Sequence, residues 1–382
     1  MPRYAIVLIG LFLFLLAGLA YLLLSPVPIN PVAWQATPFV GYSPPHARNE
    51  KLTPLQHIDL SGETGPEHVV QGPDGKLYVA LLSGAILQMQ PDGSQQTLYA
   101  RTGGRVLGLA FDSAGNLIAA DAMRGLLLIS PDRQIRVLVD QYQGLAILYP
   151  NAVVVARDGV IYFTDASQRF SPKNYDGTFQ ASVFDILEHS ATGRVFAYNS
   201  QTQQLTLVAD GLCFANGLAL SADEQSLFVA ETGEYRIWKI SRQAQALNLR
   251  KKPDPARAKL VIRDLPGYPD NLMRGLNGRI WLGLAKPRGA AIDQMAEHPW
   301  MRSLTLRLPK FLWPVPRAYG HVMAFDEMGK VLLDLQDPSG KYPETTGVTE
   351  TPEKLYIQSL HAQTLAWITN PYTLKNTDRR KP

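Results

Sequence analysis

The chain has 382 residues, 46% of them apolar, and a formal net charge of +4. This supplies enough apolar side chains for a large core. The basic residues do not interleave with aromatic ones in a stripe, so we expect no nucleic-acid partner. Cys213 is the only cysteine, which excludes an internal disulfide and a cysteine zinc cluster. Its apolar surroundings predict a buried, inert thiol.

The first predicted element is an apolar helix. From Tyr4 to Leu24 the chain carries no charged residue, and this length is sufficient to cross a bilayer. We interpret residues 1–25 as an uncleaved signal anchor, because no clear small-residue cleavage site ends the apolar run. Arg3 is expected to stay on the cytoplasmic side. The sequence therefore predicts a single-pass membrane protein whose remainder lies on the periplasmic or extracytoplasmic side.

A hairpin-like pattern then recurs six times along the chain. Each copy has a turn between two strand-like runs and a hydrophobic pair after the turn, as in Asp74-Gly75-Lys76-Leu77-Tyr78. We call the first residue of each pair the anchor, and the six anchors are Leu77, Leu117, Ile161, Leu227, Ile280 and Leu355. The shortest intervals between anchors match the ~40 residues of a four-stranded propeller blade. Six copies predict an all-β fold, a six-bladed β-propeller behind the N-terminal transmembrane helix.

The repeats divide the rest of the chain into three parts. Residues 26–60 form a juxtamembrane segment, in which the run at 52–60 is expected to supply a ring-closing strand. Residues 61–370 form the propeller, and residues 371–382 form a basic tail. Two insertions are predicted to cover one mouth of the propeller or simply to decorate its surface, and they are residues 168–188 and 286–319.

Oxygen-bearing side chains recur about ten residues before four of the anchors. They are Glu67, Asn151, Asn216 and Asp270. Each stands where the channel-facing strand of its blade begins, so ring symmetry is expected to bring them together at one end of the channel. Two carboxylates and two amide oxygens suit one Ca²⁺, with Mg²⁺ as second choice, whereas Zn²⁺ prefers His or Cys. The alternative is that each residue only bonds to its own turn.

A second set of polar residues is expected near the same end of the channel. Asp121, Asp165 and Glu231 each follow an anchor by four residues. They are expected to line the metal pocket or orient its ligands, or else to close strand-end turns, and Asp165 is the preferred catalytic candidate. Arg105 is expected to bind an anionic or carbonyl group or to pair with an acid. His68 follows a predicted ligand along a strand and is expected to pack away from the channel.

Three motifs are distinctive, and they are Leu212-Cys213-Phe214-Ala215-Asn216-Gly217, Leu265-Pro266-Gly267-Tyr268-Pro269-Asp270-Asn271 and Glu297-His298-Pro299-Trp300. In these motifs the chain resembles the strictosidine synthase-like family, which includes the adipocyte plasma membrane-associated proteins. More distantly it is similar to paraoxonases, gluconolactonases and diisopropylfluorophosphatase. The resemblance covers roughly residues 61–368.

The resemblance implies a six-bladed propeller and, as in the hydrolytic relatives, a central Ca²⁺ on the four residues above, with Asn271 as a fifth ligand. Two departures from the relatives matter. Plant synthases carry a catalytic Glu where this chain has Thr345-Thr346, with Glu344 displaced, and this argues against a Pictet–Spengler condensation. His68 and Ala152 replace acids that help paraoxonases to hold a second calcium, so one ion is expected.

We therefore expect an enzyme, a calcium-dependent hydrolase of small-molecule esters or lactones of the arylesterase or lactonase type. The ion would polarise the substrate carbonyl, and a bound water would attack it. Glu67, Asp270 or Asp165 would act as the base. Two alternatives stay open, a non-catalytic binding or scaffold propeller that keeps calcium for stability and a synthase-like condensation.

Overall fold

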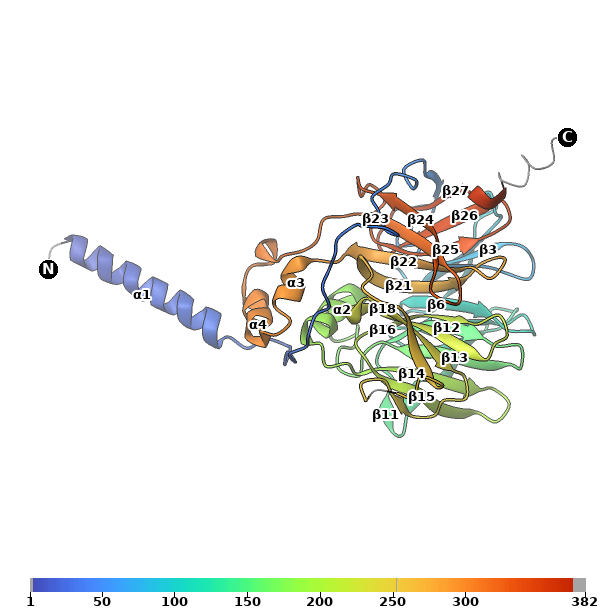
Figure 1. Cartoon of the computed structure of the whole chain (residues 1–382), viewed down its shortest axis with the longest axis horizontal. Coiled ribbons are helices and arrows are strands. Elements are labelled where there is room, and N and C mark those ends of the chain that lie inside the picture. Colours follow the sequence, from blue (N-terminus) through green and yellow to red (C-terminus); the bar gives the residue numbers. More distant parts are fainter. Residues whose placement is uncertain (1–2, 252, 374–382) are drawn as a thin grey trace.

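The computed structural model describes residues 3–251 and 253–373. The predicted basic tail therefore lies outside the described residues from position 374 onward. The chain begins with helix α1 (Arg3–Leu24), which projects away from a β-propeller (Figure 1). No described side chain of α1 is buried, and the helix is long and apolar enough to cross a membrane.

Six sheets form the blades and confirm the predicted fold, and their strands pair antiparallel except at one added strand of blade three. The first three blades follow one another along the chain from residue 68. Blade one consists of β2 (His68–Gln71), β3 (Leu77–Ala80), β4 (Ala85–Met89) and β5 (Thr97–Arg101). Blade two consists of β6 (Val106–Phe111), β7 (Leu117–Asp121), β8 (Gly125–Ile129) and β9 (Ile135–Val139). Blade three consists of β12 (Pro150–Val155), β13 (Val160–Asp165), β14 (Gly193–Asn199), β15 (Gln204–Leu212) and the added β19 (Leu247–Asn248).

The other three blades complete the ring. Blade four consists of β16 (Ala215–Leu220), β17 (Ser226–Glu231), β18 (Arg236–Ser241) and β20 (Ala258–Ile262). Blade five consists of β21 (Gly267–Arg274), β22 (Ile280–Pro287), β23 (Gly320–Phe325) and β24 (Val331–Asp337). Blade six consists of β25 (Thr345–Glu350), β26 (Lys354–Ser359), β27 (Thr364–Thr369) and β1 (Gln56–Asp59). A short hairpin, β10 (Gln141–Tyr142) and β11 (Leu145–Ala146), lies between blades two and three along the chain.

Blade six joins the two ends of the propeller chain. β1 precedes all the blades in sequence but pairs antiparallel with β27, with Gln56 opposite Trp367 and Asp59 opposite Thr364. One sheet thus contains the first and the last strand of the ring, and separating the two ends would require breaking these backbone hydrogen bonds.

The core lies between neighbouring blades. One cluster, for example, packs Ala80 and Ile86 of blade one against Leu109 and Ala119 of blade two. Near the channel, neighbouring inner strands approach so closely at some points that there is no room for a Cβ atom. A Cβ on Gly217 would lie 2.2 Å from the carbonyl oxygen of Asp270, so glycine is required where β16 passes β21.

Helices cover the end of the propeller from which α1 emerges (Figure 1). We call them the roof, and they are α2 (Gly177–Glu188), α3 (Ala290–Gln294), α4 (Pro299–Arg307) and the short η2 (Lys310–Leu312). All come from the two predicted insertions. The buried Arg302 ties the roof together, since its guanidinium donates to the carbonyl oxygens of Leu187 (2.7 Å) and Val32 (2.7 Å).

Candidate metal centre

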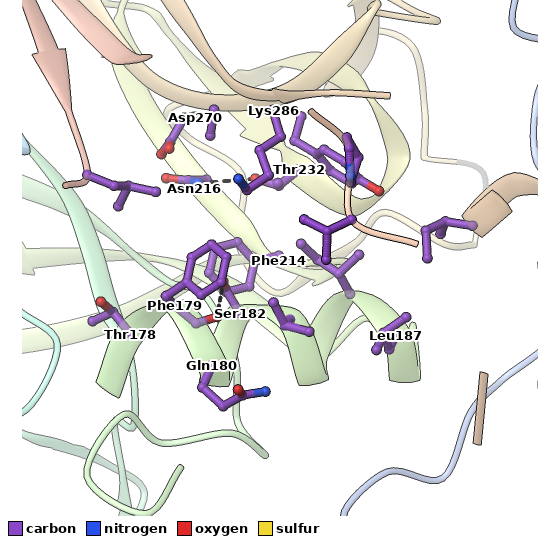
Figure 2. Close-up of a pocket in the computed structure, with 18 of the residues that line it drawn as sticks. Thr178, Phe179, Gln180, Ser182, Leu187, Phe214, Asn216, Thr232, Asp270 and Lys286 are labelled. Atoms are coloured by element: carbon purple, nitrogen blue, oxygen red, sulfur yellow. Dashed lines mark hydrogen bonds between the residues drawn. The ribbon is translucent and has the colours of Figure 1, made fainter. Parts of the chain in front are cut away.

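The four predicted ligands line one cavity of about 200 Å³ under the roof. Glu67 directly precedes β2, whereas the other three side chains project from the inner strands β12, β16 and β21. All four are buried, with at most 6% exposure. Figure 2 shows Asp270 and Asn216 on one side of this cavity, with Phe179 and Ser182 of α2 on the other. Residues far apart in the sequence thus converge at one end of the channel.

Backbone irregularities aim three of these side chains into the channel. The pairing of β12 with β13 shifts register between Pro150 and Val153, at Asn151. The equivalent shifts on β16 and β21 occur at Asn216 and Asp270. A bulge bends the strand and redirects a side chain that regular pairing would fix in the pleat. The turn-like sequences around these residues therefore encode bulges at the positions of the candidate ligands.

The oxygens at this end of the channel lack partners. The atoms Glu67 Oε2, Asn151 Oδ1, Asn216 Oδ1 and Asn271 Oδ1 are buried, with no hydrogen-bond partner among the described residues. The amide nitrogens of two of these residues are occupied, Asn216 Nδ2 by Thr232 Oγ1 (3.1 Å) and Asn271 Nδ2 by the carbonyl oxygen of Glu67 (3.0 Å). These bonds fix the amide orientations and leave the oxygens free. Each buried acceptor without a partner costs about 1–3 kcal/mol, which a cation would recover.

The charges at the site also favour a cation. Burial raises the pKa of Asp270 to about 7. Burial, reinforced by the charge of Asp270, raises the pKa of Glu67 well above its usual range. Arg105 opposes this effect only in part, with its Nη2 3.6 Å from Glu67 Oε2. Two buried carboxylates therefore face one cavity, and hard oxygen donors of this kind fit Ca²⁺.

Comparison with known proteins identifies the family. A family model described as strictosidine synthase matches residues 151–244, and one described as strictosidine synthase-like, N-terminal, matches residues 44–89. The chain is 32% identical to strictosidine synthase-like protein 10 of Arabidopsis thaliana, over 79% of this chain and 84% of that protein. The chain belongs to the strictosidine synthase-like family.

Other members extend this relationship. The chain is 30% identical to an adipocyte plasma membrane-associated protein of Salmo salar, over 84% of this chain and 78% of that protein. It is 34% identical to strictosidine synthase-like protein 13 of Arabidopsis thaliana, but that match spans only 59% of the relative's length. The apolar helix α1 and the plasma-membrane relatives together suggest a membrane protein.

Solved structures share the fold at low sequence identity. A gluconolactonase from Xanthomonas campestris superimposes with a TM-score of 0.59 at 21% identity, over 83% of this chain and 89% of that one. The calcium-binding protein regucalcin from Agrobacterium tumefaciens superimposes with a TM-score of 0.53 at 13% identity, over 82% and 94% of the two chains. These similarities establish the propeller for this strictosidine synthase-like protein.

A hydroxyl group of blade six supports the site. Thr346 Oγ1 donates to the carbonyl oxygen of Glu67 at 2.8 Å and so helps to hold this residue at the channel. The displaced Glu344 is occupied elsewhere, since its carboxylate accepts from Lys286 Nζ at 2.7 Å and contacts His361. No carboxylate of blade six is among the described residues that line the cavity, so none stands in for the missing synthase glutamate there.

The second set of acids forms hydrogen bonds to the backbone at the ends of strands. Asp121, Asp165 and Glu231 accept hydrogen bonds from the backbone N–H groups of Arg105 (3.1 Å), Tyr149 (2.8 Å) and Cys213 (2.9 Å), respectively. Each acid thus holds the chain that enters the inner strand of its own blade, and none of the three is among the described residues that line the cavity. The prediction of a catalytic Asp165 is not supported by this position, which favours the alternative of strand-end closure.

Arg105, for which the sequence left two roles open, and His68, which was expected to pack away from the channel, are both buried. Arg105 is 2% exposed and pairs with Glu67, the second of the two roles considered for it. His68 begins β2 and is buried, and burial lowers its pKa to about 4. Cys213 is buried as predicted, and burial raises the pKa of its thiol.

The sequence did not identify several residues that shape the cavity. Phe179, Lys286 and Trp313 line it from the two insertions, where no repeat indicates which side chains point inward. Thr232, which accepts from Asn216 Nδ2, could have been found as the residue after the acid Glu231. The insertions do cover this mouth, as one of the two interpretations of them predicted.

One buried acid of the roof predicts a pH dependence of stability. Asp185 in α2 is fully buried, and burial raises its pKa to about 7, above the ordinary value of 3.8. Because the folded pKa is the higher one, its stabilising contribution is complete below pH 4 and is lost as the pH rises through about 7. Asp185→Asn should therefore increase the free energy of unfolding at pH 8 by up to ~4 kcal/mol, which raises the unfolding temperature. At pH 4 the same change should have little effect.

Thermal unfolding monitored by circular dichroism at both pH values tests this prediction. The control is Asp176→Asn, an exposed residue at the N-terminus of the same helix, which should shift neither melting curve. An Asp185→Asn protein with the same pH profile as the unmodified chain would show that the carboxyl is ionised in the folded state.

Proposed function

We propose that this strictosidine synthase-like protein is a calcium-dependent hydrolase of carboxylic esters or lactones. The observation that carries the proposal is the set of buried oxygens without partners at the floor of an otherwise apolar cavity. A non-catalytic core would more simply contain apolar side chains, because buried acceptors without partners destabilise the fold. The fold shared with a gluconolactonase is consistent with lactone chemistry.

The residues of the chain have separate roles in this proposal. Glu67, Asn151, Asn216, Asp270 and Asn271 would hold Ca²⁺. When bound, the ion supplies positive charge that polarises a substrate carbonyl. Asp270 is the proposed base, because its carboxylate lines the cavity and is not paired with an arginine as Glu67 is. It would take a proton from the attacking water.

The cavity walls indicate the kind of substrate. Leu107, Tyr149, Phe214 and Phe179 line the space above the ligands. Such walls bury an apolar acyl or alcohol group and exclude bulk water from the reacting carbonyl. Lys286 is the one lysine among the described lining residues, and it is paired with Glu344. We therefore propose small esters or lactones with substantial apolar parts as substrates.

Chelation of the metal tests the proposal directly. EDTA should abolish hydrolysis of a panel of aryl esters and lactones by the full chain, and Ca²⁺ should restore it more effectively than Mg²⁺. The unfolding temperature should fall in parallel, because a ligand that binds only the folded state stabilises it. Hydrolysis that persists unchanged after chelation would overturn the metal-dependent mechanism.

The second candidate function is a binding or scaffold propeller. The candidate ligands come from four different blades, so an ion among them would cross-link the ring without any reaction. The same experiment distinguishes the two, since this alternative expects calcium-dependent stability and no hydrolysis of the panel. A condensation is less favoured, because Thr346 stands where the synthase glutamate is expected and Glu344 is paired with Lys286.

The orientation in the membrane is also a proposal. The charge of Arg3 before α1 favours a cytoplasmic N-terminus, which puts the propeller on the periplasmic or extracytoplasmic side. The test uses cells whose outer envelope has been removed while the membrane that α1 crosses stays sealed. Protease added outside these cells should then digest the propeller. Complete protection of the propeller from the protease would show that the propeller lies on the cytoplasmic side instead.

A further inference from the structure

The roof carries a group of exposed apolar side chains on its outer surface. We call it the roof patch, and it consists of Trp300 (64% exposed), Phe311 (84%) and Leu312 (53%). Two cationic residues, Lys310 and Arg317, are exposed in the same segment. Large apolar side chains this exposed and this close in sequence typically mark a contact surface.

The roof patch lies beside the end of α1. Arg307, the last residue of α4, donates from Nε to the carbonyl oxygen of Ser25 at 2.7 Å, and Ser25 directly follows α1. Val27 and Ile29 pack into the same apolar cluster as Leu306 of α4. The chain that leaves α1 is therefore held against the roof, as Figure 1 shows for α1 and α4.

The segment that bears the roof patch also forms the cavity. Thr305 and the consecutive residues from Trp313 to Pro316 are among those that line it. One side of this segment thus faces the candidate metal centre, while the side chains of Phe311 and Leu312 face outward. Whatever contacts the roof patch lies next to the mouth of the cavity.

We propose that the roof patch inserts into the surface of the bilayer that α1 crosses, so that the cavity opens toward lipid. A helix end held at the roof puts the membrane interface within reach of α4 and η2. Tryptophan favours the interface, phenylalanine and leucine favour the acyl region, and lysine and arginine contact lipid phosphates. This composition matches the roof patch and its cationic neighbours. The inference rests on α1 as a membrane span and not on the proposed hydrolysis.

The consequence concerns how ligands reach the site. Apolar molecules concentrate in the bilayer, and a cavity that opens there would receive them without passage through water. The ligand class that the site would take is therefore one that partitions into membranes, such as esters or lactones with long apolar chains. An exposed cavity mouth facing solvent would instead favour water-soluble compounds.

A fluorescent probe on the roof patch tests the contact. The only native cysteine is buried, so a thiol-reactive NBD dye should label an introduced Phe311→Cys selectively. In the full chain, reconstituted in phosphatidylcholine–phosphatidylglycerol nanodiscs, we expect a blue-shifted emission, several-fold brighter than that of the same dye in water. We also expect quenching by lipids that carry a spin label on the acyl chain. Trp300→Cys serves as a second probe position.

The matched control is Met328→Cys. Met328 is 75% exposed and lies in the turn between β23 and β24, at the end of blade five away from the cavity. Its probe should remain water-exposed and unquenched. The proposal is overturned if the probes at positions 311 and 300 behave like this control. It is also overturned if they are shielded from water but not quenched by the labelled lipid, because a protein, either a partner or a second copy, would then cover the roof patch.

Discussion

The Asn216→Ala protein should lose its response to calcium and its hydrolytic activity together. Asn216 supplies a buried Oδ1 without a partner, held in place by the bond from Nδ2 to Thr232. Changes to groups that only orient metal ligands cost ~10–100-fold in metal affinity, so loss of a direct ligand should cost at least ~100-fold. The catalytic rate at limiting calcium should fall by a similar factor.

The stability measurement is independent of any substrate. Calcium at ~100 times its dissociation constant should stabilise the unmodified chain by about 2.7 kcal/mol. At the same calcium concentration, a variant that binds ~100-fold more weakly gains only about 0.4 kcal/mol. Calcium-dependent melting of both proteins by differential scanning fluorimetry gives this comparison.

The control is Asn370→Ala, which also removes a buried amide. Asn370 is 1% exposed, bonds to Glu350 and Thr351, and is not among the described residues that line the cavity. It should lower stability but retain the full response to calcium. If Asn216→Ala retains that response as well, Asn216 is not a ligand. If only the response disappears and the unmodified chain hydrolyses nothing, the binding propeller is the better interpretation.

The sequence predicted the ring and its candidate ligands for the same reason. A propeller repeats one unit, so a constant offset from Leu77, Ile161 or Ile280 selects equivalent points of different blades. The offset failed by one residue at Asn216, in a blade with a longer turn. Repetition also indicated which strand ends meet in the channel, although those residues are far apart in the chain.

The same reasoning did not determine side-chain direction. Asp121, Asp165 and Glu231 do reach the same end of their blades as the ligands, but each turns to the backbone N–H that precedes an inner strand. An offset gives the level of a residue along a strand and not the bulges that redirect its neighbours. The repeat left both roles open for these acids, and their bonds to the backbone favour strand-end closure over facing the cavity.

The roof could not be predicted in detail because it lies outside the repeat. Its two insertions have no equivalents in other blades, and their packing depends on single contacts such as those of the buried Arg302. The residues that give the cavity its apolar character, among them Phe179 and Trp313, belong to these insertions. Substrate preference is therefore encoded in the part of the chain that repetition does not constrain.

The Asp165→Ala protein should be strongly destabilised. Asp165 is fully buried and pairs with Arg194, with 2.6 Å between Oδ2 and Nη2, while Oδ1 accepts from the N–H of Tyr149. Removal of one partner leaves an uncompensated buried guanidinium, which typically costs 3–5 kcal/mol. Urea unfolding at pH 7 should show this loss, whereas a purely catalytic acid at a solvated cavity would change the rate and leave stability nearly unaltered.

A double variant separates the ion pair from the backbone contact. Asp165→Ala combined with Arg194→Met removes both charges, so the part of the loss due to the unpaired guanidinium should be recovered. What remains should reflect the hydrogen bond to Tyr149, of the order of 1–3 kcal/mol. Since Tyr149 lies two residues before Asn151, both variants should also bind calcium more weakly. If Asp165→Ala instead melts like the unmodified chain while hydrolysis is abolished and calcium binding is unchanged, Asp165 contributes to the chemistry after all.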